Sequence, residues 1–298
     1  MAKNRVTIDY LYSKKHRGEK ITRVVLWDYP MALLADSAGV DMILVGDSVG
    51  MVILGYPNTI PVTMEEMIHH CKAVTRGRDR CLVVGDLPFM SYEASTDQAV
   101  RNAGRLVKEG GVDAVKIEGG QHLAETAYAI CKAGIPVHGH IGLTPQRVKQ
   151  LGGFKVQGKT VQSAVDLFKD ASALAEAGCF AITLECAPPI LGRLISEGLA
   201  SVIVISAGSG PDCDGQSVNL YDMVGLTQRA SPRFVKRYSE VGSTIKSSIQ
   251  QFCQETLRGT FPAKEHCYNI ESELSAEIRR AIEDMARGSQ GTNSRGHE

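Results

Sequence analysis

Six short apolar runs in this chain each end in a side chain that can bind a metal ion or move a proton. The runs span residues 24–28, 42–47, 81–86, 114–118, 135–140 and 181–185, and a seventh, 201–206, ends in small residues. Continuous apolar runs are typical of parallel strands that are buried on both faces. In a closed (β/α)8 barrel all strands end at one mouth, where active sites are built. The pattern therefore predicts an enzyme whose polar residues meet at one end of a barrel.

Helical segments are expected between and after these runs. They span residues 7–16, 30–39, 63–76, 95–110, 121–134, 161–178, 188–198, 239–258 and 272–287. Several of them end at a glycine, as helices often do, and Thr63 with Glu66 forms a capping box. The eighth strand, near 217–220, is weak, but an all-parallel sheet of eight strands closes naturally. A (β/α)8 TIM barrel is therefore favoured over an open doubly wound sheet.

No change in composition marks a second domain. We expect one barrel domain with an N-terminal helix over residues 1–258. Residues 259–298 are expected to form a C-terminal helical extension that ends in a polar, disordered tail.

Charge and composition argue against several classes of function. Lys and Arg together number 33, as do Asp and Glu, so the net charge is zero and no basic patch indicates nucleic-acid binding. No apolar run approaches the ~18 residues of a membrane span, and the N-terminus lacks the apolar core of a signal peptide. The eight dispersed cysteines form no Cys-x-x-Cys pair, which indicates reduced thiols. We expect a cytoplasmic protein that acts on small molecules, with no nucleic-acid or membrane partner.

Asp47 and Asp86 form the strongest candidate pair. Each ends an apolar run in nearly the same phrase, Leu-Val-Gly-Asp and Val-Val-Gly-Asp. Two carboxylates at neighbouring strand ends suit Mg²⁺ and leave coordination positions for a substrate. The alternative is that each aspartate caps the helix or turn that follows it.

Lys116 and Glu118 lie two apart on one strand and therefore share a face. A charged pair inside a barrel is costly to bury, which indicates a function. Lys116 could bind a substrate carboxylate, while Glu118 could approach the metal directly or through water. A structural ion pair at the barrel mouth is the alternative.

His138 and His140 also share a face. His138 is expected to be a hydrogen-bonded residue of the barrel interior, and His140 a candidate neighbour of the site. A zinc or iron site made of both histidines and one carboxylate is the alternative. Glu185 ends the run 181–185 and could act as general base and acid, or else cap a helix or form an ion pair.

Residues 153–160 match the P-loop pattern G-x-x-x-x-G-K-[ST] letter for letter. That motif binds phosphate only where it joins a strand directly to a helix N-terminus. Here a short helix, residues 144–151, is expected to precede it, so a lid or assembly loop is favoured over nucleotide binding.

Eight phrases of the sequence resemble those of the ketopantoate hydroxymethyltransferase family, in order from about residue 20 to 238. They span residues 45–51, 61–63, 86–92, 115–120, 139–146, 152–158, 184–186 and 213–216. The resemblance implies a barrel of the phosphoenolpyruvate/pyruvate superfamily type, a homo-oligomer that is a decamer, and one Mg²⁺ per subunit. It implies transfer of a hydroxymethyl group from 5,10-methylenetetrahydrofolate to 3-methyl-2-oxobutanoate, giving 2-dehydropantoate for pantothenate and coenzyme A synthesis.

The resemblance also implies roles for individual residues. The metal-site acids are Asp47, Asp86 and Glu118, and the catalytic acid/base is Glu185. The substrate contacts are Asp47, Ser48, Asp86 and Lys116.

Four positions depart from the family pattern: Ser206, Ser209, Tyr221 and Met31. The serines replace smaller residues near the barrel mouth, which leads us to expect a change in substrate or folate affinity without loss of activity. Two other functions remain as alternatives. One is a related Mg²⁺-dependent lyase or mutase acting on another 2-oxo acid, and the other is a non-catalytic binding or assembly protein.

Overall fold

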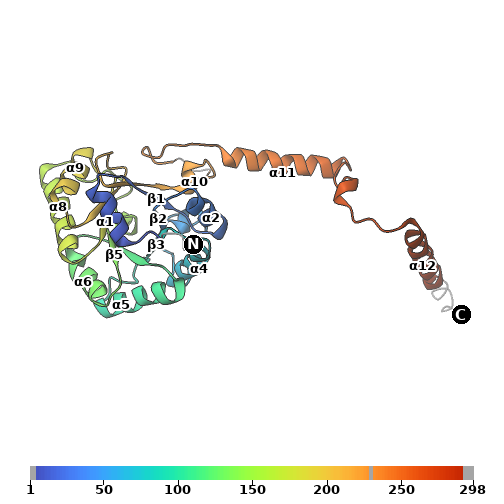
Figure 1. Ribbon diagram of the computed structural model, residues 1–298, viewed down its shortest axis with the longest axis horizontal. Helices are drawn as coiled ribbons and strands as arrows, with labels where there is room; N and C mark the ends of the chain where they lie inside the picture. Colours follow the sequence, from blue (N-terminus) through green and yellow to red (C-terminus); the bar gives the residue numbers. More distant parts are fainter. Residues whose placement is uncertain (1–4, 228–230, 291–298) are drawn as a thin grey trace. The chain divides into compact units, whose positions relative to one another are not determined.

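The computed structural model describes residues 5–227 and 231–290. Eight parallel strands close into a barrel in chain order, each paired with the next and β8 paired with β1 (Figure 1). The strands are β1 (Ile21–Val25), β2 (Met42–Val45), β3 (Leu82–Asp86), β4 (Ala114–Glu118), β5 (Val137–Gly142), β6 (Ala181–Glu185), β7 (Ile203–Ala207) and β8 (Gly215–Asn219). The predicted (β/α)8 barrel is confirmed.

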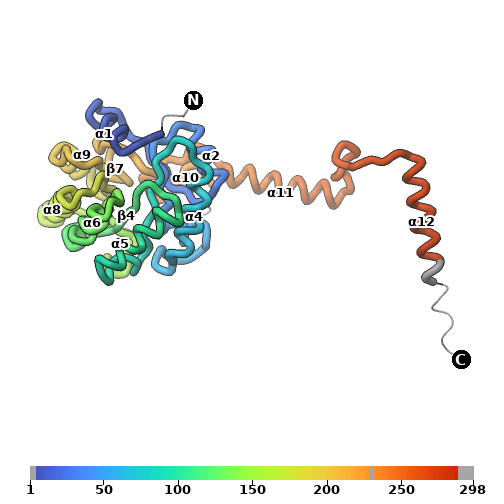
Figure 2. The backbone as a smooth tube through the Cα atoms, turned by 60° about the horizontal axis from the view of Figure 1, so that its bottom comes forward, coloured from blue at the N-terminus to red at the C-terminus, as the bar shows by residue number. Residues whose placement is uncertain are grey.

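Helices surround the ring of strands, as Figure 2 shows. They are α2 (Tyr29–Ser37), α3 (Val49–Val52), α4 (Met64–Arg76), α5 (Thr96–Arg105), α6 (Ala124–Lys132), α7 (Val148–Leu151), α8 (Val161–Glu176), α9 (Pro189–Gly198) and α10 (Leu220–Met223). Single helical turns extend or precede three of these helices: η1 (Leu106–Gly110), η2 (Gln121–Leu123) and η3 (Pro145–Arg147). The predicted capping box of Thr63 and Glu66 begins α4.

One expected strand is shifted. The run 24–28 was expected to be a strand that ends in Asp28, but β1 ends at Val25, and the Asp28 side chain accepts a hydrogen bond from Met31 N to cap α2. The strand starts earlier because Ile21 and the following residues pair with β8, from Gly215 onward.

The barrel wall separates two apolar clusters. Side chains that point outward pack under the helices, for example Ile43, Val83 and Ile182. Side chains that point inward fill the lower part of the barrel, for example Met42 and Val84. This separation follows from the period of two along each strand.

Helix α1 (Ile8–His16) closes the N-terminal end of the barrel (Figure 1). Its Leu11 belongs to the inner apolar cluster and is fully buried. The Tyr12 hydroxyl donates to the carbonyl of Ser201, and Lys15 Nζ donates to the carbonyl of Val202. The site must therefore be reached from the opposite end.

The chain divides by its contacts into Met1–Gly242 and Ser243–Glu298. The second unit contains most of α11 (Val241–Leu257), the turn η4 (Lys264–His266) and α12 (Ser272–Gln290). The expected end of the barrel domain at residue 258 stays a prediction; no residue of α11 is buried. Of the tail expected to be disordered, residues 291–298 lie outside the described residues. Over the described ranges, no helix is long and apolar enough to cross a membrane.

Candidate active site

The expected acidic residues meet at the C-terminal mouth of the barrel. Asp47 follows β2, while Asp86 and Glu118 are the last residues of β3 and β4. One carboxylate oxygen from each of the three lies within 4.8 Å of the others, and all three side chains are buried. The backbone N–H of Asp47 donates to Asp86 Oδ2 (3.0 Å), so this aspartate is held across the two strand ends. Ser48, not Asp47, occupies the N-cap position of α3, and Asp86 Oδ2 accepts from the neighbouring strand end, so neither aspartate serves as the cap of the alternative interpretation.

Lys116 lies among these acids. Its Nζ is 3.0 Å from Asp86 Oδ1 and 3.1 Å from Glu118 Oε1, and its side chain is 4% exposed. Burial lowers the pKa of Lys116, but Asp86, Glu118 and Asp47 outweigh it, so the pKa is raised and the amine stays charged. The predicted inward-facing pair of Lys116 and Glu118 is therefore present.

Negative charge is least compensated at Asp47. Burial, followed by the charges of Glu118 and Asp86, raises the pKa of Asp47 well above its usual value. Burial would raise the pKa of Glu118 as well, but Lys116 and His140 lower it to about 2. A cation placed close to Asp47 would favour the ionised form of its carboxylate.

Gln146, from turn η3, enters the site and connects two of its acids. Its Nε2 donates to Asp47 Oδ2 (2.9 Å) and to the carbonyl of Leu87 (3.0 Å), while its backbone N–H donates to Glu118 Oε2 (3.1 Å). The Tyr92 hydroxyl donates to Gln146 Oε1 (2.5 Å) and accepts from the backbone N–H of Glu118 (3.1 Å). Gln146 and Tyr92 are both buried and thus hold the carboxylates in place.

His140 lies between two glutamates. Its Nδ1 is 3.0 Å from Glu118 Oε1, and its Nε2 is 3.2 Å from Glu185 Oε2. Burial lowers the pKa of His140, but the charge of Glu118 and the hydrogen bonds to Glu118 and Glu185 together raise it to about 9. A protonated imidazole can therefore orient Glu185, which at 21% side-chain exposure is the acid of this group that reaches the open mouth.

A polar layer below the acids contains an arginine that the sequence interpretation missed. Buried Arg23 donates through Nη1 to Thr183 Oγ1 (2.8 Å) and through Nε to Ser217 Oγ (2.9 Å). Its Nη1 also lies 3.0 Å from His138 Nε2, and burial together with the Arg23 charge lowers the pKa of His138 well below its usual value. His138 is thus a neutral interior residue, as expected.

The backbone next to Glu185 is tightly fixed. Cys186 has a left-handed φ of 48°, a conformation that costs a non-glycine residue about 1–2 kcal/mol. Its N–H donates to the carbonyl of Ala207 (2.9 Å), and its own carbonyl accepts from Gln157 N (2.9 Å). These bonds hold the strained turn that follows the catalytic candidate.

Ser206 and Ser209 support the same turn. The Ser209 hydroxyl donates to the carbonyl of Leu184 (2.8 Å) and accepts from Ala187 N (3.1 Å), while Ser206 Oγ accepts from Ser209 N (2.9 Å). Both serines are 0% exposed, so their hydroxyls serve the backbone and do not line the mouth. The change in substrate or folate affinity that we expect from these serines stays a prediction, and it would act through the backbone turn that they hold.

The other two departures pack away from the acids. The Tyr221 ring packs against Trp27 with the ring centroids 5.3 Å apart and the planes tilted by 44°, and its hydroxyl donates to Asp28. Met31 packs against the outer apolar cluster. Trp27 in turn donates through Nε1 to the carbonyl of Gly46 (2.6 Å), the residue before Asp47.

Ser48 is half-buried beside Asp47, at the start of α3, and its side chain makes no capping hydrogen bond there. Its place next to two of the acids is compatible with the expected substrate contact.

The P-loop lookalike does not have P-loop surroundings. Strand β5 ends at Gly142, and η3 and α7 lie between it and residues 153–160. Thr160, the last residue of the match, instead caps α8 by accepting from Ser163 N. The segment is a loop, as expected, and does not join a strand to a helix.

The donor set fits a hard divalent cation. Asp86 Oδ1 is buried and accepts no hydrogen bond of good geometry from the described residues, although Lys116 lies within ion-pair distance. Three carboxylates supply oxygen ligands of the kind Mg²⁺ binds, together with water or substrate oxygens. The zinc or iron alternative required both histidines, but His138 lies below the acids against Arg23. The residues therefore fit Mg²⁺ better than a softer metal.

Comparison with known proteins identifies close relatives. The sequence model described as ketopantoate hydroxymethyltransferase matches residues 5–264. The chain is 53% identical over 266 residues to a 3-methyl-2-oxobutanoate hydroxymethyltransferase of Moorella thermoacetica, covering 89% of this chain and 98% of the relative. A protein of the same name from Carboxydothermus hydrogenoformans is 51% identical over 275 residues, covering 92% and 99%.

Solved structures of similar fold are more distant in sequence. Phosphonopyruvate hydrolase, in a complex with oxalate and Mg²⁺, aligns with a TM-score of 0.57 at 12% identity, covering 93% of this chain and 98% of that one. A 2,3-dimethylmalate lyase of the PEP mutase/isocitrate lyase superfamily aligns with a TM-score of 0.54 at 13% identity, covering 95% and 98%. These similarities support the barrel fold alone.

Proposed function

The chain belongs to the ketopantoate hydroxymethyltransferase family, whose members are enzymes of pantothenate synthesis, and from that premise we propose its detailed reaction. The enzyme transfers the methylene carbon of 5,10-methylenetetrahydrofolate to C3 of 3-methyl-2-oxobutanoate, with water supplying the hydroxyl group of 2-dehydropantoate. The observation that carries this proposal is the buried cluster of Asp47, Asp86 and Glu118 beside Lys116.

Asp47 and Asp86 would hold Mg²⁺ directly. Both oxygens of Glu118 already face donors: Oε1 faces Lys116 and His140, and Oε2 accepts from Gln146 N. Glu118 would complete the metal site, directly or through water. Bound Mg²⁺ would supply Lewis-acid polarisation of the keto group, which makes the proton on C3 more acidic.

Lys116 would bind the carboxylate of the 2-oxo acid. Its three N–H donors are on a buried side chain that is held at Asp86 and Glu118, so the charge is already oriented before the substrate arrives. Ser48, half-buried next to Asp47, offers a hydroxyl to the same substrate.

Glu185 would remove the proton from C3. Its carboxylate reaches the mouth and is oriented by His140 Nε2 at 3.2 Å. The carbonyl of Glu185 accepts from Leu143 N (2.9 Å), and the Cys186 turn fixes the chain on the other side. A base held this way can abstract a proton and later return it.

We further propose a homo-oligomer in the cytoplasm, a decamer if this chain follows its family, without nucleic-acid or membrane partners. Sedimentation velocity of the purified full chain measures the oligomer size directly.

The test is hydrogen–deuterium exchange at C3 of 3-methyl-2-oxobutanoate, followed by proton NMR without any folate. We expect exchange with Mg²⁺ and none with EDTA, and we expect Glu185→Gln to slow it at least 100-fold. Glu197→Gln is the matched control, because Glu197 is an exposed glutamate of α9. Absence of exchange in the wild type with Mg²⁺ would refute the assigned substrate or the enolisation step.

A further inference from the structure

Arg23 is a buried cation that has no role in the steps described so far. Its side chain lies inside the barrel at 3% exposure. Among the described residues it forms no ion pair, and its hydrogen-bond partners are the uncharged side chains of Ser217, Thr183 and His138. An isolated charge is costly to bury, so an arginine in this position calls for a function.

The other two cations of the site are already paired. Lys116 Nζ lies 3.0 Å from Asp86 Oδ1, and His140 Nδ1 lies 3.0 Å from Glu118 Oε1. A cation in contact with a carboxylate adds little net charge to its surroundings, because the two fields largely cancel. The field of Arg23 is not cancelled in this way.

The polar layer holds this charge directly beneath the mouth of the barrel. His138 and Thr183 precede His140 and Glu185 by two residues on β5 and β6, so each pair shares the inward face of its strand. Two residues of a strand rise about 7 Å. The Arg23 guanidinium, bound to His138 and Thr183, therefore lies one layer below His140 and Glu185.

Arg23 stays charged at neutral pH. Burial lowers its pKa to about 10, while the charges of Asp86 and Glu185 act against burial. These two acids belong to different strands, β3 and β6, so the charge of Arg23 acts on more than one side of the mouth. Among the described residues, the hydrogen bonds of the guanidinium use Nε and Nη1 and leave Nη2 without a partner.

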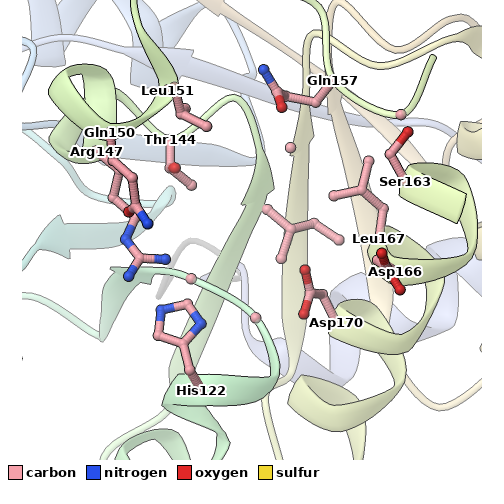
Figure 3. Close-up of a pocket in the computed structure, with 15 residues that line it drawn as sticks. His122, Thr144, Arg147, Gln150, Leu151, Gln157, Ser163, Asp166, Leu167 and Asp170 are labelled. Carbon is pink, nitrogen blue, oxygen red and sulfur yellow. The ribbon is translucent and has the colours of Figure 1, made fainter. Parts of the chain in front are cut away.

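Arg147 is another cation near the strand ends, but it faces a separate space. It lines a cavity of about 460 Å³ that is enclosed by the residues after β4, the segment from the end of β5 to α8, and α8 itself. Figure 3 shows Arg147 beside His122, across this cavity from Asp166 and Asp170. Its charge therefore does not take the place of Arg23 inside the barrel.

We propose that Arg23 is a specificity-determining residue for the charge of the ligand at the mouth, an inference that rests on the proposed function. Its positive charge attracts the carboxylate of the keto acid and repels the cation that binds at Asp47 and Asp86. Arg23 thereby adds affinity for an anionic 2-oxo acid and lowers the affinity for Mg²⁺. Its partners in the polar layer fix the guanidinium without neutralising it, as this role requires.

The expected effect follows from Coulomb's law. Over about 7–10 Å, at an effective dielectric constant of about 20, one unit charge changes a binding constant on the order of 10-fold. Loss of the Arg23 charge should therefore weaken keto-acid binding and strengthen Mg²⁺ binding. A role in packing alone would weaken both or leave both unchanged, so the opposite directions identify a role of the charge.

The test is isothermal titration calorimetry of the full chain with Mg²⁺ alone, and then with 3-methyl-2-oxobutanoate at saturating Mg²⁺. We expect Arg23→Met to lower the Kd for Mg²⁺ at least 5-fold and to raise the Kd for the keto acid at least 5-fold. Arg23→Lys, which keeps the charge, should stay within threefold of the wild type for both ligands. Arg101→Met, at an exposed arginine of α5, is the matched control.

A second uncharged variant guards against a folding defect. Replacement of a buried charge by a neutral side chain of similar shape is often tolerated, so Arg23→Met is expected to fold. Arg23→Gln removes the charge but keeps N–H donors in the polar layer. It should shift both Kd values in the same directions as Arg23→Met.

Three results decide the matter. Kd values that move in the same direction in the uncharged variants, or that stay within twofold of the wild type, would overturn the proposal. Failure of Arg23→Lys to restore both values would overturn it too, because the hydrogen bonds and not the charge would then matter. A wild-type enzyme that binds Mg²⁺ but not the keto acid would instead contradict the proposed function, and the Mg²⁺ titrations would still decide on Arg23.

Discussion

Replacement of Gln146 by leucine tests whether this side chain holds the acids together. The change removes the hydrogen bonds to Asp47 and to the Leu87 carbonyl, while the Tyr92 hydroxyl keeps the Glu118 N–H and lies 3.4 Å from the Glu118 carbonyl. A hydrogen bond to a charged group contributes about 2 kcal/mol, and each buried polar group left unpaired costs about 1 kcal/mol or more. Burial of the leucine side chain returns about 1 kcal/mol. We therefore expect the free energy of unfolding to fall by about 2 kcal/mol.

The measurement is urea unfolding followed by the fluorescence of Trp27, the single tryptophan of the chain, which is fully buried in the barrel. EDTA and a fixed protein concentration keep metal binding and self-association constant. Gln251→Leu is the matched control, since Gln251 Nε2 also donates to a carboxylate, Glu255 Oε1 (2.8 Å), but on an exposed helix face. The control should change stability by less than ~0.5 kcal/mol. A loss below ~1 kcal/mol in Gln146→Leu, or one equal to that of the control, would refute the reasoning.

Three further predictions concern the metal, pH and the departures from the family. Mg²⁺ at 100 times its Kd should raise the free energy of unfolding by about 2.7 kcal/mol, and Asp86→Asn should abolish that gain in the same urea assay. His138 stays neutral when folded but takes up a proton when unfolded below its usual pKa of 6.5, so stability should fall as pH drops below that value. His138→Asn should reduce this fall between pH 6.5 and 5; an identical pH dependence would count against a neutral His138. Ser209→Ala should cost about 1–3 kcal/mol, because Ala187 N–H loses its buried acceptor, and a large rise in keto-acid KM instead would show that the serine faces ligand.

The fold could be predicted from the alternation of apolar runs with helical segments. The main acids could be predicted because each lies at the end of an apolar run. Apolar runs that alternate with helical segments predict a parallel barrel, and strand ends in a barrel converge. Asp47, Asp86 and Glu118 therefore had to meet, and Lys116 had to face inward with Glu118.

Gln146 and Tyr92 could not be predicted in the same way. Both lie in connections after strands, where the path of the backbone is fixed by tertiary contacts and not by a repeating pattern. Arg23 did carry a signal, since it is a charged residue directly before the apolar residues Val24 and Val25 of β1. Its role in the polar layer depends on Thr183 and Ser217, which lie far away in the chain and carry no charge to attract notice.

The extent of the barrel domain is also hard to predict from the sequence, for a physical reason. The pattern of residues 239–258 predicts a helix, and α11 is there, but a helical pattern does not reveal what its apolar face contacts. Burial, which decides membership of a core, is a tertiary property.

The closure of the barrel floor by α1 has a consequence for the order of events in turnover. Leu11 and the inner apolar cluster fill that end of the barrel. Within the described residues, substrates can therefore enter and products can leave only through the C-terminal mouth. A keto acid bound at buried Lys116, as proposed, would lie deeper than a second substrate that enters through the same mouth, and that second substrate would then block its path. We expect a compulsory order, with the keto acid arriving first and its product departing last. In steady-state kinetics the product 2-dehydropantoate should then inhibit competitively against the keto acid. No other pair of product and substrate should give competitive inhibition.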